Sequence, residues 1–291
     1  MKEVTKRDIE LWIQTIARGE FHYKEVLDGG VNPAAFGKVR KYLHELCKAS
    51  EPICESIGRR DGYYRPIEDK AQPVDFTNMR ARKDFPVILP FDLRKYVFLY
   101  PETVTAVGGS KSSGKTGFLY RTVKLNLGKV NLKFLSNMEG GKDQMYDRFK
   151  AMGIDLEAQP GFIYYKEDNF HDYIKEKDTL YIIDYIDAPD GVDFYLIGAA
   201  IGKIRKKLTK VGGSLAVVGL QKPYHRDIAV GGEQTLKNTD LYLAMDNNKL
   251  KIVDAKVPAN KRIHPKNMQW TFQYDDEGTN FLNIQQSEEV T

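Results

Sequence analysis

The residues that point most directly to chemistry form a glycine-rich stretch in the middle third of the chain. They read GSKSSGKT at residues 109–116, and a short apolar stretch precedes them. Glycines at this spacing permit a tight loop whose backbone N–H groups point inward, and a helix start adds positive potential, so such a loop binds phosphate. Lys115 would reach the β- and γ-phosphates, and the Thr116 hydroxyl would bind Mg²⁺. We therefore predict that ATP and Mg²⁺ are bound by Gly109, Ser110, Ser112, Ser113, Gly114, Lys115, Thr116 and Gly117.

Polar side chains at the ends of later apolar stretches are candidates for the rest of this site. Asp184 follows the apolar residues 180–183, and a carboxylate at such a strand end would hold the Mg²⁺ shell. Asp187 is a weaker alternative that could simply cap a turn. Glu139 could orient the attacking water, or it could be a residue that favours the start of the next helix. Gln221 ends a further apolar stretch and could sense the γ-phosphate.

The pattern of apolar residues from about residue 85 onward predicts an α/β fold with a mainly parallel sheet flanked by helices. Short buried-type strands alternate with helices, and the last strands are connected by hairpins, so an antiparallel edge should come last. The predicted strands cover residues 103–107, 132–135, 162–165, 180–183, 214–219, 241–244, 250–253 and 269–272, and the predicted helices cover 116–127, 142–152 and 194–211.

The first 69 residues have a different pattern, with three helices followed by a hairpin. Ile9, Trp12, Ile13 and Ile16 share one face of the first helix, Asn32 and Pro33 start the third, and a Gly58–Gly62 turn joins two short strands. This arrangement is typical of a winged helix-turn-helix, whose third helix enters the major groove of DNA. Winged helices also bind proteins, but basic residues occur on both expected contact elements. The predicted DNA contacts are Lys38, Arg40 and Lys41 on the helix and Arg59, Arg60 and Arg65 on the hairpin.

The composition limits the class of protein. The chain has 291 residues, a net charge of +4 and a 42% hydrophobic fraction, which is ordinary for a globular protein. Its apolar runs are shorter than the ~18 residues that a membrane span needs, and its first residues are too charged for a signal peptide. We therefore expect a cytoplasmic protein. Cys47 and Cys54 lack metal-ligand spacing and are expected to be reduced thiols.

Taken in order, these segments resemble the RecA-like P-loop ATPases, and more narrowly the DnaB-type replicative helicases and the KaiC/RadA branch. GSKSSGKT resembles Walker A, and LYIIDYI at 180–186 resembles Walker B. SNME at 136–139 resembles the segment with the family's catalytic glutamate, but the glutamate stands one residue later here than in the family. IRKKL at 204–208, followed by VVGLQ at 217–221, resembles the segment that ends in the family's glutamine.

The resemblance extends over about residues 85–275 and includes a basic finger. VDAK at 253–256 resembles the strand whose basic residues reach the ATP of a neighbouring subunit. Pro258 stands where the family has an arginine, so Lys261 or Arg262 would have to serve. The resemblance thus implies ATP hydrolysis, self-association into a ring or filament, and nucleotide contacts from Lys256 and Arg262.

These patterns together predict a winged helix-turn-helix at 1–69, a linker at 70–86, a RecA-like core at 87–282 and a flexible tail at 283–291. We expect an ATP-hydrolysing, DNA-associated protein, of the compact helicase-like kind that phages and mobile elements use in replication or recombination. The alternative is an ATP-gated DNA-binding regulator or loader that assembles on DNA without unwinding it. A metabolic kinase ranks lower, because the sequence has no motif for an acceptor substrate.

Overall fold

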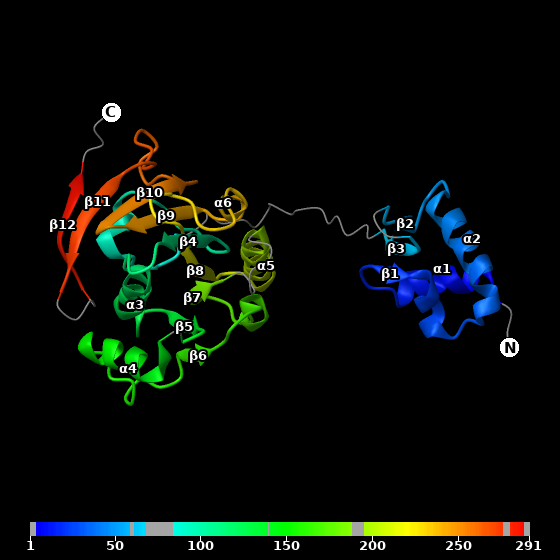
Figure 1. Cartoon of the computed structure of the whole chain (residues 1–291), viewed down its shortest axis with the longest axis horizontal. Helices are drawn as coiled ribbons and strands as arrows, with labels where there is room; N and C mark the ends of the chain where they lie inside the picture. The colour runs from blue at the N-terminus through cyan, green and yellow to red at the C-terminus, as the bar shows by residue number, and fades with distance from the viewer. Residues whose placement is uncertain are drawn as a thin grey trace. The chain divides into compact units, whose positions relative to one another are not determined.

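The computed structural model describes residues 4–58, 61–67, 84–138, 140–187, 195–275 and 280–287. The chain divides into two compact units, residues 1–79 and residues 80–291, which are described separately below. Figure 1 shows the elements of both units. Among the residues that the structure describes, none of the helices combines the length and apolar character needed to cross a bilayer.

The first unit packs helices against a small antiparallel sheet. In its described residues the strand order is β1-β3-β2. The capping box between Thr5 and Asp8 starts α1, and the Asn32 side chain accepts from the N–H of Ala34 at 3.0 Å at the start of the segment that leads into α2. The elements are α1 (Lys6–Thr15), β1 (Phe21–His22), 3₁₀ turns at Tyr23–Gly29 and Pro33–Ala35, α2 (Phe36–Cys47), β2 (Cys54–Ser56) and β3 (Tyr63–Pro66).

The core of this unit follows the predicted face of the first helix with one exception. Ile9, Trp12 and Ile13 are buried, together with three residues of α2, Val39, Leu43 and Leu46. Ile16 is 51% exposed, because α1 ends at Thr15 and the chain turns away after it. The first and third predicted helices and the hairpin are therefore present, and a 3₁₀ segment at Tyr23–Gly29 stands where the second helix was predicted. The role of this unit as a winged helix stays a prediction.

The second unit is an α/β fold built on a sheet of nine strands within the described residues, in the order β12-β11-β10-β9-β4-β8-β7-β5-β6. The strands from β9 to β6 in this order are parallel, and β10, β11 and β12 are antiparallel. The strands are β4 (Val104–Gly109), β5 (Asn131–Ser136), β6 (Ile163–Tyr165), β7 (Thr179–Ile186), β8 (Leu215–Gln221), β9 (Leu241–Asp246), β10 (Lys249–Ala255), β11 (Gln269–Tyr274) and β12 (Phe281–Ser287). The predicted α/β class, with its antiparallel edge, is confirmed.

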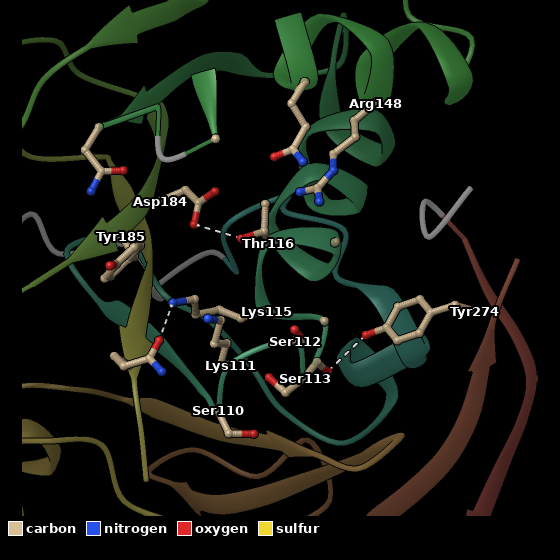
Figure 2. Close-up of a pocket in the computed structure, with 16 residues that line it drawn as sticks. Ser110, Lys111, Ser112, Ser113, Lys115, Thr116, Arg148, Asp184, Tyr185 and Tyr274 are labelled. Atoms are coloured by element: carbon tan, nitrogen blue, oxygen red, sulfur yellow. Dashed lines mark hydrogen bonds between the residues drawn. The ribbon is translucent and has the colours of Figure 1, made fainter. Parts of the chain in front are cut away.

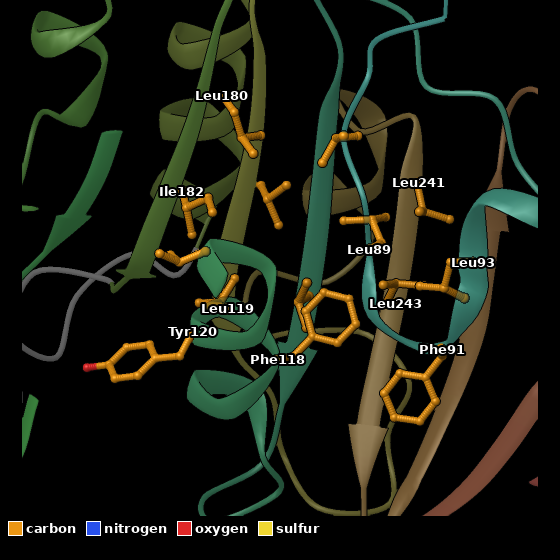
Figure 3. Close-up of a cluster of buried hydrophobic side chains, with 14 of the residues drawn as sticks. Leu89, Phe91, Leu93, Phe118, Leu119, Tyr120, Leu180, Ile182, Leu241 and Leu243 are labelled. Atoms are coloured by element: carbon orange, nitrogen blue, oxygen red, sulfur yellow. The ribbon is translucent and has the colours of Figure 1, made fainter. Parts of the chain in front are cut away.

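Helices cover both faces of this sheet. The helical segments are α3 (Lys115–Asn126), α4 (Gly141–Ala151), α5 (Tyr195–Val211), α6 (Gln234–Lys237) and 3₁₀ turns at Pro90–Lys95 and Phe170–Tyr173. Along β7, Leu180 and Ile182 belong to the cluster that α3 and α4 join, whereas Tyr181 and Ile183 belong to the cluster with α5. This alternation is expected for a strand buried on both faces. Figure 3 shows the first cluster.

A buried asparagine joins the extended segment before β4 to α3 by hydrogen bonds. Asn126 is fully buried, and its side chain donates to the carbonyl oxygen of Ile88 at 2.7 Å and accepts from the N–H of Ile88 at 2.8 Å. Both backbone groups of Ile88 are thereby satisfied away from a sheet. This contact joins the C-terminal end of α3 to the segment before β4.

The end of the chain differs from the prediction. The expected tail at 283–291 is strand β12 as far as Ser287, and β12 pairs with β11 from Tyr274↔Phe281 to Gln269↔Ser287. The remaining residues of the expected tail, 288–291, lie outside the described part of the chain.

Candidate functional site

The glycine-rich loop joins β4 to α3, as the sequence predicted. Gly114 has φ +93°, a conformation that side chains other than glycine rarely adopt, and a Cβ there would overlap the Tyr274 hydroxyl. A Cβ on Gly109 would crowd the side chains of Ser113 and Lys115. Each motif glycine thus has a physical reason, and the loop can curve tightly around a ligand.

The loop forms one wall of a cavity of about 720 Å³ (Figure 2). The other walls come from the carboxyl ends of neighbouring parallel strands and from α4 and β11. This is the edge at which open α/β sheets bind ligands. The lining residues are Ser110 to Gly117, Asn137, Gly140, Gln144, Arg148, Asp184, Tyr185, Gln221 and Tyr274.

Lys115 is the cation at the floor of this cavity. Its residue is 7% exposed, and its Nζ donates to Gln221 Oε1 at 3.3 Å. The same ammonium lies 3.7 Å from the centroid of the Tyr185 ring, a cation–π arrangement. The structure therefore brings Lys115 and Gln221 together, so a group bound by Lys115 would also be next to the end of β8.

Thr116 and Asp184 are neighbours in the lining of the cavity. The Thr116 hydroxyl donates to Asp184 Oδ1 at 3.4 Å, and Asp184 is 6% exposed. The peptide between Asp184 and Tyr185 is cis. Asp187, the weaker alternative, is exposed, accepts from the Tyr185 hydroxyl at 3.4 Å and does not line the cavity. The geometry thus favours Asp184.

A hydroxyl and a carboxylate are oxygen ligands of the kind that Mg²⁺ prefers. Among the described residues no group of three or more His, Cys, Asp or Glu side chains is placed to hold a metal on its own. Mg²⁺ usually takes one or two protein oxygens and completes its shell with phosphate oxygens and waters. Thr116 and Asp184 therefore fit a magnesium ion that arrives with a nucleotide.

The buried hydroxyl of Ser113 supports the fit of an anion. Within the described structure this Oγ has no hydrogen-bond partner, although Ser113 is 4% exposed and lines the cavity. A buried polar group without a partner is costly, and a phosphate oxygen would satisfy it. The donor set of the loop thus suits the phosphates of a nucleotide.

Glu139, the candidate base, lies outside the described residues. Its neighbours on either side are described: Asn137 and Gly140 line the cavity, and the N–H of Met138 donates to Ser136 Oγ at 2.9 Å. The catalytic role of Glu139 stays a prediction.

The sequence analysis missed several residues of the cavity wall. Gln144 and Arg148 are one helical turn apart on α4, and Arg148 extends toward Thr116 in Figure 2. Two polar residues at this spacing, shortly after a strand end, are a pattern from which they could have been predicted to line the cavity. Tyr274 comes from β11, and its hydroxyl donates to the carbonyl oxygen of Ser113 at 3.0 Å. No local signal in the sequence indicates that contact.

The residues of the expected finger are not in this cavity. β10 runs antiparallel to β9, with Ala255 opposite Leu241, so Lys256 lies at the end of the sheet away from the loop. Its Nζ is 3.6 Å from Asp240 Oδ1. Arg262 is exposed and does not line the cavity. Neither residue lines the cavity of its own chain, and a contact with the nucleotide of a second subunit stays a prediction.

The predicted DNA contacts in the first unit are partly engaged in ion pairs. Arg40 pairs with Asp61 at 2.7 Å, and Arg65 pairs with Glu55 at 2.6 Å, all at exposed positions. Such surface pairs contribute little to stability, so the arginines can exchange partners at small cost. Lys38 and Lys41 are exposed on α2. Arg59 and Arg60 lie outside the described residues.

No protein-family model matches the chain, and no curated protein matches it in sequence. Among solved structures, the chain is similar to the ATPase domain of a DnaB-type helicase, with 13% identity and a TM-score of 0.48 over 64% of this chain and 86% of that one. The assignment of an α/β core with a mainly parallel sheet therefore rests on the chain's own topology, in which β8 separates the loop strand β4 from the Asp184 strand β7.

Proposed function

We propose that this chain binds ATP with Mg²⁺ in the 720 Å³ cavity and hydrolyses it. The observation that carries the proposal is the convergence of Lys115, Thr116 and Asp184 on one cavity beside a loop whose glycines permit close approach of a ligand. A cation, a hydroxyl and a carboxylate in this arrangement suit the phosphates and the metal of a nucleotide.

The residues divide the work by their chemistry. The loop N–H groups, the start of α3 and Lys115 would bind the phosphates, and Thr116 and Asp184 would hold the Mg²⁺, which supplies charge neutralisation at the phosphates. Glu139 would orient the attacking water. Arg148 is a further cation on the same cavity and would stabilise negative charge that develops on the phosphates during transfer.

Replacing Lys115 tests this proposal. Lys115→Ala should reduce turnover about 10²- to 10³-fold, as loss of a single electrostatic donor does in other enzymes. Lys129→Ala removes the same charge from an exposed position outside the cavity and should leave turnover unchanged. Phosphate release and a thermal melt are measured on both variants. Parental turnover in a folded Lys115→Ala protein would refute the assignment of the loop.

We further propose that the first unit is a winged helix-turn-helix that binds duplex DNA, and that the ATPase core acts on DNA as a compact helicase-like protein. The exposed cations of α2 and the antiparallel β2–β3 hairpin support this proposal. Such a protein would serve replication or recombination of a phage or mobile element.

The second candidate is an ATP-gated regulator or loader that assembles on DNA without unwinding it. The position of Pro258 favours it, because a proline replaces the arginine expected two residues after Lys256 and forms an isolated bridge with Val97. Strand displacement on a forked DNA separates the two candidates. A helicase-like protein separates the strands when ATP is present, whereas a loader shows ATP-dependent retention on the fork and leaves the duplex intact.

A further inference from the structure

Asp246, the last residue of β9, holds two loops at once. Its Oδ1 accepts from the Ser110 hydroxyl of the glycine-rich loop at 2.6 Å. Its Oδ2 accepts from Lys222 Nζ and from the N–H of His225, both at 3.0 Å, in the segment that follows β8. Because β4 lies between β8 and β9, the ends of all three strands meet at this carboxylate.

The segment from Lys222 to Val230, here called the β8–α6 loop, has further bonds to the glycine-rich loop. The N–H of Lys222 donates to the carbonyl oxygen of Gly109 at 3.0 Å, and the Tyr224 hydroxyl donates to that of Lys111 at 3.2 Å. At the base of the β8–α6 loop, the N–H of Val230 donates to the carbonyl oxygen of Gln221 at 2.9 Å. The β8–α6 loop is therefore hydrogen-bonded directly to Gly109 and Lys111, and it is linked to Ser110 through Asp246.

Charge and burial make Asp246 the strongest of these links. The Lys222 side chain is 1% exposed, so its ammonium has almost no access to water. Burial raises the pKa of Asp246, but the hydrogen bonds from Ser110, Lys222 and His225 outweigh this effect and hold that pKa at about 2. The carboxylate is thus an anion at neutral pH, and its removal would leave a buried cation.

Asp246 does not line the nucleotide cavity, whereas Gln221, the residue before Lys222, contacts Lys115 there. Phosphates that attract Lys115 compete with Gln221 for its ammonium. A change at Lys115 can therefore reach the β8–α6 loop through Gln221, while Asp246 sets the resting position of that loop. Residues 223–227 of the loop are exposed, so a change in the conformation of the loop alters a surface that solvent and other molecules can reach.

We propose that Asp246 is a positioning residue that couples the glycine-rich loop to the β8–α6 loop, so that nucleotide binding changes the exposure of the latter. The proposal rests on the function proposed above. Coupling between two sites is reciprocal, so loss of Asp246 must alter both the nucleotide affinity and the response of the β8–α6 loop. A carboxylate that only stabilised the fold would alter neither in the folded protein.

Asp240, at the other end of β9, provides a matched control. It precedes β9, pairs with Arg205 and Lys256, and accepts from the N–H of Val104 at 3.3 Å. Asp240→Asn and Asp246→Asn therefore remove the same charge from ion-paired positions flanking one strand. They differ in that Asp240 lies at the end of the sheet away from the nucleotide cavity.

Trypsin provides a direct measure of the exposure of the β8–α6 loop in the full chain. Arg226 is exposed in this loop, and Lys222 is resistant to cleavage because proline follows it. We expect Mg²⁺ with ADP or a non-hydrolysable ATP analogue to change the rate of cleavage after Arg226 by about fivefold or more, as coupling of ordinary strength requires. In Asp246→Asn this ratio should fall to about one and nucleotide affinity should change, whereas Asp240→Asn should keep both parental values.

Two further variants protect the test against a folding defect. Ser110→Ala cuts the link to the glycine-rich loop and leaves Asp246 paired with Lys222, so the nucleotide-dependent ratio should fall while the melting temperature changes little. Lys222→Met removes the buried charge and its partner interaction, and should also reduce the ratio. A parental ratio in folded Asp246→Asn, or in both other variants if Asp246→Asn does not fold, would overturn the proposal.

Nucleotide affinity, measured directly with a fluorescent ADP derivative, separates this proposal from the function on which it rests. If the parental protein binds the nucleotide but its cleavage rate does not respond, the coupling is wrong and the nucleotide site stands. If the parental protein does not bind the nucleotide, both are wrong.

Discussion

The carboxylate of Asp184 and the hydroxyl of Thr116 are the two protein groups that are expected to bind the metal ion. At 3.4 Å they are close enough to share one ion or one of its waters. Asp184→Asn should therefore weaken Mg²⁺-dependent nucleotide binding about 10- to 100-fold, the usual effect of losing an outer-shell partner of a metal. Nucleotide affinity with and without EDTA measures this loss. Asp187→Asn is the control, and a loss confined to that variant would transfer the role to Asp187.

Glu139 has a different expected role, because a water-orienting group acts on hydrolysis and not on binding. Glu139→Gln should keep Mg²⁺-dependent ATP affinity and lower turnover by about 10²- to 10⁴-fold, the usual contribution of an acid–base group. Single-turnover hydrolysis and binding are measured on the same preparation, with the exposed Glu157→Gln as control. Parental turnover in Glu139→Gln would make the glutamate a helix-start residue only.

The cavity residues that could be predicted are those that belong to a contiguous motif or stand at the end of a predicted strand. Lys115 and Thr116 belong to the first kind, and Asp184 and Gln221 belong to the second. Tyr274 and Asp246 could not be predicted, because they reach the glycine-rich loop from strands that follow it by more than a hundred residues. Their contacts depend on strand order, which local patterns do not encode.

At the scale of elements, apolar periodicity predicted the parallel strands well because they are buried on both faces. It failed for β12, an edge strand with mostly exposed residues, in which Leu282 is 45% exposed and Ile284 is 42% exposed. Its sequence FLNIQQS has too few apolar residues to indicate a buried face. The edge position explains both the polar composition and the missed prediction.

The hairpin of the first unit is the element on which DNA binding can be tested. Arg59→Ala with Arg60→Ala should lower duplex affinity, and should reduce the slope of log affinity against log salt by about 0.9 for each lost phosphate contact. Basal ATP hydrolysis should not change. The charge-matched control is Arg7→Ala with Arg18→Ala, which removes exposed cations outside α2 and the hairpin.

A deletion of residues 1–69 tests the same unit as a whole. The shortened chain should keep nucleotide binding and lose tight duplex binding. Duplex affinity equal to that of the intact chain would show that the first unit is not the DNA-binding module. It would then be assigned to protein docking, and the loader candidate would be favoured.

At the scale of the whole molecule, we predict an oligomer in which one subunit completes the site of the next. Lys256 and Arg262 do not line the cavity of their own chain, and a cation supplied by a neighbour can raise turnover about 10³- to 10⁵-fold in other P-loop enzymes. A mixture of Arg262→Ala and Lys115→Ala subunits should therefore recover part of the turnover that each lacks alone.

The control mixture combines Lys115→Ala with Glu139→Gln. Both lesions are on the nucleotide-binding side of the interface, so no interface in that mixture is intact and no recovery is expected. Sedimentation with ATP and DNA provides an independent measurement. A strict monomer under those conditions would contradict the prediction.

The central place of β4 in the sheet also determines when, during synthesis, the protein becomes able to bind a nucleotide. The glycine-rich loop leaves the ribosome early, but β4 pairs with β8 from Val104↔Ala216 and with β9 from Thr105↔Leu241. Ser110 and its partner Asp246 are 136 residues apart in the sequence. A nascent chain that already contains the whole phosphate motif therefore still lacks both strands that hold it, and contacts this distant form late. Nucleotide binding by a growing chain should begin only after β9 has emerged, so it marks the pairing of β4 with both neighbouring strands and not the completion of the motif.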